Sequence, residues 1–345
     1  MQTRFSPAQL ADPAVAESEK ILRKCVHCGF CTATCPTFVL LGDELDSPRG
    51  RIYLMKEMLE NDRPADAETV KHIDRCLSCL SCMTTCPSGV HYMHLVDHAR
   101  AHIEKTYARP LGERILRSVL ATMLPHRSRF RLALLGAFYG KPFAPLLKRI
   151  PGIGPRLAAM LALAPSRMPG RSASERPGVR PPTSAPRGRV ALLNGCAQPV
   201  LQPGINEATI RLLARLGYEV VIAADEGCCG ALVHHMGREH EAHAQAARNV
   251  EAWWRETRAG GGAGLDAVLI TASGCGTTVK DYGFMFRDDP AMKEKAAAVS
   301  GLAKDVSELL AGLDLPEMPS NGLVVAYHSA CSMQHGQKIR TEPKM

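Results

Sequence analysis

The chain has 345 residues, 13 cysteines and a formal net charge of +8. That length allows two domains with cores of their own, and no apolar stretch approaches the ~20 residues of a membrane-spanning helix. The first twenty residues are polar and lack the apolar segment of an export signal. We therefore expect a cytoplasmic protein whose thiols stay reduced and hold metal instead of forming disulfides.

Proline-led helix starts organise the first third of the chain. Asp12-Pro13 and Ser47-Pro48 each place a capping residue before a proline, which predicts one helix leading to Cys25 and another ending near Glu60. Further helical stretches are expected over residues 66–74 and from Pro87 to about residue 107. No alternating strand pattern separates them, so residues 1–110 are predicted to form an α-helical domain.

Two cysteine runs with the same spacing interrupt these helices. Each reads C-x₂-C-x₂-C-x₃-C-P, the pattern of ferredoxins with two [4Fe–4S] clusters, in which the fourth cysteine ligates the other cluster. The predicted ligands are Cys25, Cys28, Cys31 and Cys86 for one cluster, and Cys76, Cys79, Cys82 and Cys35 for the other. Structural zinc is the alternative, but zinc sites usually take two ligand pairs from separated knuckles. His27 lies inside the first run, where a role in tuning the cluster and a plain surface role both remain open.

A basic region follows the helical domain. Residues 111–189 hold 15 Lys and Arg against 2 Asp and Glu, so the rest of the chain is net acidic. No recognition-helix or aromatic-studded pattern accompanies this charge, and we expect no nucleic-acid partner. The basic region could instead contact an acidic partner subunit or anionic lipid, or it could simply be a solvated connector. Residues 111–164 are predicted to be a basic helical connector, and residues 165–188, with six prolines, a flexible linker.

Strands alternate with helices over residues 189–345, which predicts an α/β domain with a parallel sheet. Strands are expected at 190–193, 218–223, 267–271 and 323–327, and a cysteine follows each of them. Ligands of open parallel sheets bind beyond the carboxyl ends of the strands. A third candidate metal site is therefore formed by Cys196, Cys228, Cys229 and Cys275. Buried apolar thiols are the alternative.

The second half also contains an internal repeat. Residues 190–198 resemble residues 324–334, because in both a short strand runs into a cysteine, Cys196 or Cys331, with a glutamine shortly after. By the period of the first copy, the chain ends before the second copy reaches its paired cysteines. We therefore expect an incomplete second repeat, either a C-terminal truncation or a half-copy without a metal site.

These motifs resemble a known family. The two cysteine runs, the stretch Ser47-Pro48-Arg49-Gly50-Arg51 and the Cys228-Cys229-Gly230 motif are similar to those of the iron–sulfur subunits of bacterial glycolate oxidases. The resemblance implies a ferredoxin-type domain with two [4Fe–4S] clusters and a cysteine-rich (CCG) domain. It also implies an electron-transfer subunit of an oxidoreductase acting on CH–OH groups.

The same resemblance implies the cofactors and partners. FAD on glycolate oxidase partner subunits would oxidise glycolate to glyoxylate, and a quinone or another acceptor would receive the electrons. The chain itself has no dinucleotide fingerprint after a strand, and no catalytic residue is assigned. Related subunits serve lactate or glycerol-3-phosphate dehydrogenases and heterodisulfide-reductase-like complexes, which stay open as alternatives, as does a non-enzymatic redox sensor. A peripheral position on the inner face of the cytoplasmic membrane is a further option.

Overall fold

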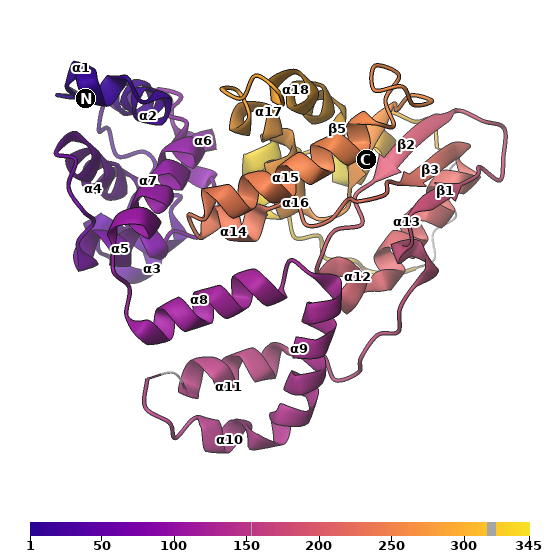
Figure 1. Cartoon of the computed structure of the whole chain (residues 1–345), viewed down its shortest axis with the longest axis horizontal. Coiled ribbons are helices and arrows are strands. Elements are labelled where there is room, and N and C mark those ends of the chain that lie inside the picture. The colour runs from indigo at the N-terminus through magenta and orange to yellow at the C-terminus, as the bar shows by residue number, and fades with distance from the viewer. Residues whose placement is uncertain (153, 316–321) are drawn as a thin grey trace. The chain divides into compact units, whose positions relative to one another are not determined.

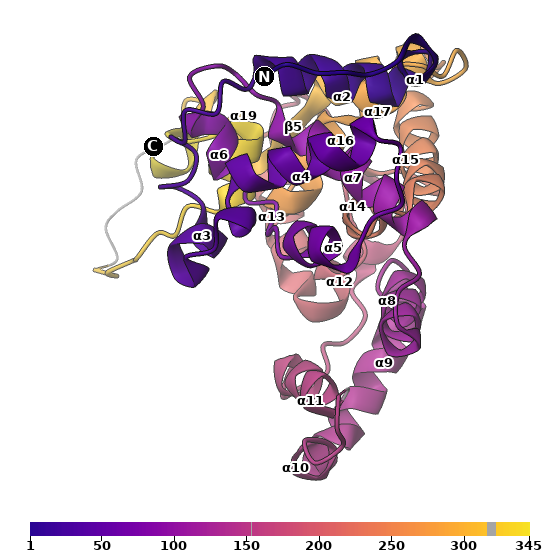
Figure 2. The ribbon, with the colours of Figure 1, turned by 90° about the vertical axis from the view of Figure 1, so that its left-hand side faces the viewer.

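A computed structural model describes residues 1–152, 154–315 and 322–345. The chain divides into two compact units, each of which gathers segments that are distant in the sequence (Figures 1 and 2). The first unit consists of Met1–Ala108, Val233–Glu241 and Ser307–Met345, and the second of Arg109–Leu232 and Ala242–Val306. In the described part of the chain, no helix is both long and apolar enough to cross a membrane.

The first unit is helical, as predicted. Its helices up to residue 106 are α1 (Pro7–Leu10), α2 (Pro13–Lys24), α3 (Pro36–Leu41), the short 3₁₀ turn η1 (Glu44–Asp46), α4 (Pro48–Glu60), α5 (Ala67–Asp74), α6 (Ser81–Thr85) and α7 (Tyr92–Thr106). The predicted helix starts are confirmed, because Asp12 caps α2 and Ser47 caps α4, each before a proline. The prolines fit there because the first N–H of a helix has no partner within the helix.

Aliphatic side chains of α2, α4, α5 and α7 form the core of this unit. The fully buried ones include Leu22, Met55, Met58, Ile73, Leu95 and Ile103. Asp97 of α7 is also buried, and it faces His234 and His235 at distances of 3.3 and 3.5 Å. Burial alone would raise the pKa of Asp97, but these histidines outweigh it and hold the pKa below its usual range.

A five-stranded sheet forms the centre of the second unit. Its strands are β1 (Gly178–Arg180), β2 (Gly188–Leu192), β3 (Tyr218–Ile222), β4 (Ala267–Ile270) and β5 (Ala303–Asp305), in the order β1-β3-β2-β4-β5. All neighbouring pairs are parallel except β1 and β3. The predicted parallel sheet is therefore confirmed, and β2 lies at its middle with Val190 opposite both Val220 and Ala267.

Helices pack against this sheet and extend from it. They are α8 (Leu111–Met123), α9 (Arg127–Gly140), η2 (Lys141–Phe143), α10 (Ala144–Leu147), α11 (Gly154–Leu163), η3 (Ala173–Glu175), α12 (Gln198–Leu201), α13 (Pro203–Arg215), α16 (Ser273–Lys280), α17 (Tyr282–Met285) and α18 (Lys293–Leu302). Three more, α14 (Ala231–His235), α15 (Glu239–Trp254) and α19 (Val306–Ala311), have residues in both units. Trp253 and Tyr282, both fully buried, anchor one core cluster against the sheet.

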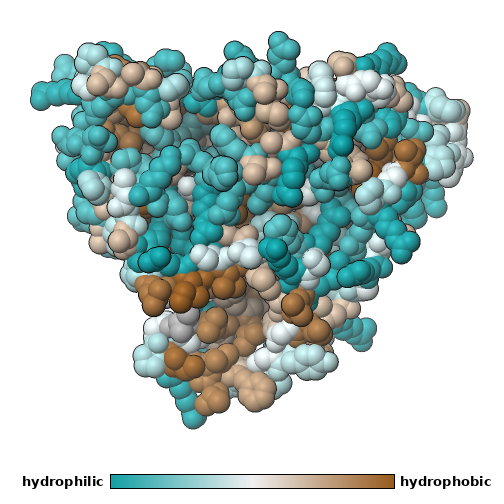
Figure 3. Space-filling model, viewed as in Figure 1, coloured by the Kyte–Doolittle hydropathy of each residue, from teal (hydrophilic) through white to brown (hydrophobic). Residues whose placement is uncertain are grey.

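Helices α8–α11 form an arm of the second unit with an unusually apolar surface. Hydrophobic side chains gather over it in the space-filling view (Figure 3). Its exposed large side chains include Leu111, Ile115, Leu132, Phe138, Tyr139, Phe143, Leu146 and Leu163. Soluble monomers seldom expose a large contiguous apolar patch unless something binds to it.

Two local expectations differ from the structure. The strand expected at 323–327 is absent, and these residues are irregular, with Val324 fully exposed. The short segment Ala303–Asp305 pairs with β4 instead, so the edge position is already taken. The segment 165–188, expected to be a flexible linker, contains η3 and the edge strand β1. Edge strands tolerate prolines because one row of their backbone groups needs no partner.

Candidate metal centres

The four cysteines assigned to the first cluster line one pocket of the first unit. They are Cys25, Cys28, Cys31 and Cys86. The loop turns tightly because the residues on either side of Cys28 are left-handed, His27 with φ 57° and Gly29 with φ 85°. This turn lets three thiols within seven residues approach a single centre, and the chain after α6 brings the fourth.

The second set lines a neighbouring pocket of the same unit, and one of its members, Cys82, also lines the first pocket. It consists of Cys35, Cys76, Cys79 and Cys82. Its loop repeats the backbone of the first, with left-handed residues on either side of Cys79, Ser78 with φ 50° and Leu80 with φ 62°. Because Leu80 is not a glycine, that conformation costs about 1–2 kcal/mol. The residue before the middle cysteine, His27 or Ser78, is left-handed and not a glycine in either loop, which indicates that the turn itself is needed.

The thiols in these pockets suit a cationic centre. Burial raises the pKa of Cys31 to about 11, and the neighbouring Cys25 adds to the effect. Burial likewise raises the pKa of Cys82. Several thiolates can lie so close together only when a metal centre compensates their charge. His27 also lines the first pocket, and its buried Nε2 has no hydrogen-bond partner among the described residues.

Two buried polar residues support the pockets, a role that the sequence motifs did not reveal for either of them. Tyr92 lines both of them, and its hydroxyl donates to Cys76 Sγ over 3.7 Å. Arg51, with 1% of its side chain exposed, places Nη1 3.8 Å from Cys35 Sγ. The same guanidinium donates to Asp46 Oδ1 (3.2 Å) and to the carbonyl oxygen of His72 (2.7 Å). Such partners orient ligands and tune the centre they hold.

The stretch from Ser47 to Arg51 now has a physical explanation. Ser47 Oγ accepts a hydrogen bond from Gly50 N, and a side chain on Gly50 would place its Cβ 2.1 Å from the carbonyl oxygen of Glu44. The helix start therefore packs directly on η1. It directs Arg49 to the first cysteine loop, where its guanidinium lies against Gly29, and Arg51 to the second. One helix terminus thus supplies an arginine to each pocket.

The four rim cysteines converge in the second unit. Cys196 follows β2, Cys228 and Cys229 follow β3, and Cys275 lies in the first turn of α16 after β4. Their thiols contact one another in series, from Cys196 through Cys228 and Cys229 to Cys275. Cys331 is not part of this group, because it lies in the first unit and interacts with Cys79.

The rim thiols resist ionisation in the absence of a cation. The contact with Cys228 and burial both raise the pKa of Cys196. A hydrogen bond with Cys228 favours the thiolate of Cys229, but contact with Cys275 and burial outweigh it and hold the pKa of Cys229 well above its usual range. Four adjoining soft ligands of this kind match the donor set of an iron–sulfur or zinc centre.

A buried polar network holds the loop that carries the paired cysteines. Asn249 accepts a hydrogen bond from Gly227 N and donates to the carbonyl oxygen of Cys228, at 2.8 and 2.9 Å. The Tyr282 hydroxyl donates to the carbonyl oxygen of Cys229 over 2.8 Å. Both side chains are buried, so the loop is held rigidly. Neither residue carries a signal that sequence analysis could have used.

Two domain families match the chain in the regions just described. Residues 21–90 match the "4Fe-4S dicluster domain", and residues 190–280 match the "Cysteine-rich domain". The first match covers both cysteine runs, and the second covers all four rim cysteines. No solved structure matches the chain.

Two of the curated relatives match over nearly the whole chain, and a third matches over less than half of it. The "Glycolate oxidase iron-sulfur subunit" of Escherichia coli (strain K12) is 43% identical over 99% of this chain and 78% of its own length. The "Probable glycolate oxidase iron-sulfur subunit" of Bacillus subtilis (strain 168) is 32% identical over 94% of this chain and 73% of its own length. "Lactate utilization protein A" of Bacillus subtilis is 25% identical over 45% of this chain and 62% of its own length. The chain belongs to the family of glycolate oxidase iron–sulfur subunits.

Proposed function

We propose that this chain is the iron–sulfur electron-transfer subunit of an FAD-dependent glycolate oxidase. The observation that carries the proposal is the pair of cysteine-lined pockets in the first unit. Cys86 of the second run lines one pocket with the first run, and Cys35 of the first run lines the other pocket with the second run. Its 43% identity to the Escherichia coli subunit supports glycolate as the substrate of the complex.

Two [4Fe–4S] clusters fit the donor sets. Cys25, Cys28, Cys31 and Cys86 would hold one, and Cys76, Cys79, Cys82 and Cys35 the other. A bound cluster of this type takes up and releases one electron at a time. The chain's own residues hold the centres, shield them from water and set their electrostatic surroundings through Tyr92, Arg49 and Arg51.

The substrate chemistry belongs to partner subunits in this proposal. Oxidation of glycolate to glyoxylate removes two electrons, and FAD on a partner subunit can accept both as a hydride. This chain would then carry the electrons singly to a quinone or another acceptor. A related subunit with a lactate or glycerol 3-phosphate partner would need the same arrangement, so the flavin subunit's pocket decides the substrate.

The rim cysteines form a third candidate centre. Cys196, Cys228, Cys229 and Cys275 meet at the carboxyl ends of three parallel strands, where a metal or a further iron–sulfur cluster would be held. The adjacent pair Cys228 and Cys229 suits a cluster better than a single tetrahedral ion, because neighbouring cysteines can bind different irons.

The apolar arm α8–α11 is the proposed surface for partner subunits. It exposes large apolar side chains together with Lys148 and Arg149, a combination that suits an acidic, partly apolar partner or an anionic membrane. Changing Lys148 and Arg149 to Gln should weaken partner retention in a pull-down, most clearly at raised salt. Loss of binding to anionic vesicles with unchanged pull-down would identify the membrane instead.

The decisive experiment purifies the chain with its bound partners under anaerobic conditions. Iron and acid-labile sulfide should reach about eight each per chain from the two ferredoxin-type sites, and more if the rim site is filled. Glycolate should then drive dye reduction faster than lactate or glycerol 3-phosphate. Zinc without sulfide would contradict the central assignment, and a preference for lactate would transfer the proposal to that class of complex.

A further inference from the structure

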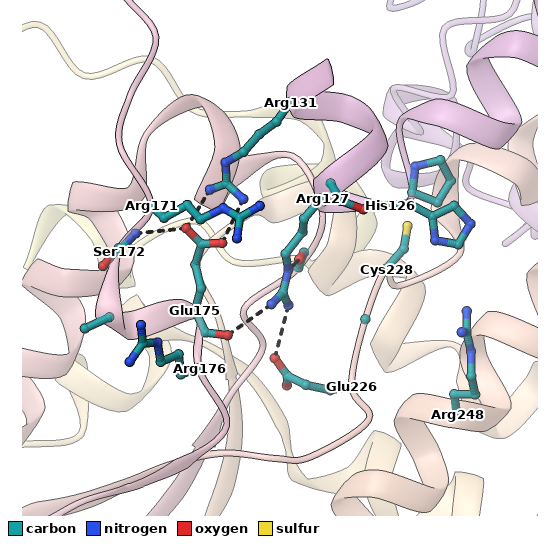
Figure 4. A pocket seen from close by; sticks show the side chains of 15 residues that line it. His126, Arg127, Arg131, Arg171, Ser172, Glu175, Arg176, Glu226, Cys228 and Arg248 are labelled. Carbon is teal, nitrogen blue, oxygen red and sulfur yellow. Dashed lines mark hydrogen bonds and ion pairs between the residues drawn. The ribbon is translucent and has the colours of Figure 1, made fainter. Parts of the chain in front are cut away.

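A cavity of about 740 Å³ lies next to the rim cysteines in the second unit (Figure 4). Five arginines from three segments line it: Arg127 and Arg131 of α9, Arg171 and Arg176 of the proline-rich segment, and Arg248 of α15. Cys228 and Glu226 line the same cavity. Its volume falls within the range of pockets that bind small molecules.

The two inner arginines, Arg127 and Arg131, are held in place by hydrogen bonds, but each keeps an N–H donor without an acceptor among the described residues. Arg131 donates to Glu175 Oε2 over 3.0 Å, and Arg127 Nε donates to the carbonyl oxygen of Gly195 over 2.7 Å. Arg127 Nη2 lies 3.7 Å from Glu226 Oε1, too far for a hydrogen bond. This atom and Arg131 Nε are buried, and neither has a hydrogen-bond partner among the residues that the structure describes. A buried donor without an acceptor is costly, so an acceptor at this place would be favourable.

The three outer arginines have no anionic partner in the described part of the chain. Within the described residues, no hydrogen bond or ion pair involves the guanidinium of Arg171, Arg176 or Arg248. The two carboxylates of the cavity, Glu175 and Glu226, already face the inner arginines. Three positive charges are therefore left unbalanced around one cavity.

We propose that this cavity binds a small molecule with at least two anionic groups, of the carboxylate or phosphate class. Arginine is suited to this task because its planar fork of donors matches the two oxygens of either group. Three uncompensated guanidinium groups favour a multiply charged anion over a single carboxylate. The inference uses only the arginines and the cavity, so it holds whichever substrate the assembled complex oxidises.

The test measures anion binding to the full chain, purified anaerobically, by isothermal titration calorimetry at constant ionic strength. Citrate and pyrophosphate are the probes, and acetate is the control with a single charge. Citrate or pyrophosphate should bind saturably and acetate much more weakly. Arg171→Gln and Arg248→Gln should each weaken binding about tenfold, since a hydrogen bond to a charged group contributes that much.

Two further variants separate recognition from general charge. Arg171→Lys keeps the charge but loses the planar fork, so its affinity should lie between those of the native chain and Arg171→Gln. Arg215→Gln removes an exposed arginine of α13 that does not line the cavity and should leave binding unchanged. The altered side chains are exposed, so melting temperatures should stay the same. The proposal is overturned if neither probe saturates, if Arg171→Gln and Arg248→Gln bind as the native chain does, or if Arg215→Gln weakens binding equally.

Discussion

Replacing Arg51 with methionine removes the guanidinium that links Cys35 to the core of the first unit. Arg51 and Asp46 are an ion pair with only 1% and 0% of their side chains exposed. Removing one partner of such a pair costs about 3–5 kcal/mol because the other charge stays buried. Asp46 keeps Arg75 at 2.8 Å and His72 at 3.0 Å, so the lower end of that range, about 3 kcal/mol, is expected.

Arg49 provides a matched control from the same helix start. Its pair with Glu44 is much more exposed, at 34% and 47%, so Arg49→Met should cost less than about 1 kcal/mol. For a unit of this size, 1 kcal/mol corresponds to about 2–4 °C in melting temperature. Thermal melting of the anaerobic protein, followed by the visible absorbance of its clusters, should thus show a decrease of about 6–12 °C for Arg51→Met and under about 4 °C for Arg49→Met.

A double variant sharpens the interpretation. If the loss comes from an uncompensated Asp46, then Asp46→Asn together with Arg51→Met should cost less than the sum of the two single changes. Equal melting temperatures for Arg51→Met and Arg49→Met would refute the reasoning. Strict additivity in the double variant would do the same, since it would show that the two side chains do not interact.

Three other outcomes follow from the structure. Cys35→Ser should perturb the EPR signal of the cluster held by the second cysteine loop and Cys86→Ser that of the first; each serine affecting its own loop's cluster would reverse the ligand assignment. Gly50→Ala should destabilise the chain by roughly 1–3 kcal/mol, because the added Cβ would overlap a backbone carbonyl. Gly112→Ala in α8 is the control: a Cβ added there meets no other atom, so this change should be neutral or stabilising in the same melting assay. Asp97→Asn should destabilise the protein at pH 6, because the pKa of Asp97 is lower in the folded chain than its value of about 3.9 in the unfolded chain. The stability that this difference contributes is present above the unfolded pKa and is lost as the pH falls below it, so the difference in melting temperature should shrink towards pH 3. A melting difference that does not shrink would contradict this.

Local sequence determined much of this protein. The cysteine spacing places three thiols of each run in one short loop. A capping residue followed by proline starts α2 and α4 where these helices were predicted. Short apolar segments before Cys196 and Cys228 predicted β2 and β3, because strands of a covered parallel sheet must be apolar throughout. These features depend on neighbours a few residues apart, which is why a pattern in the sequence reveals them.

Tertiary structure alone decided which residues meet. The edge of the sheet went to Ala303–Asp305 and not to residues 323–327, because only one segment can pair with β4 on that side. Arg127 and Arg131 look like ordinary surface charges in a basic region, yet they line a cavity and face buried or half-buried carboxylates. Arg51 likewise becomes a buried partner of Asp46. The sequence shows which side chains are charged. Their contribution to stability or binding depends on burial and on partners that only the folded chain brings close.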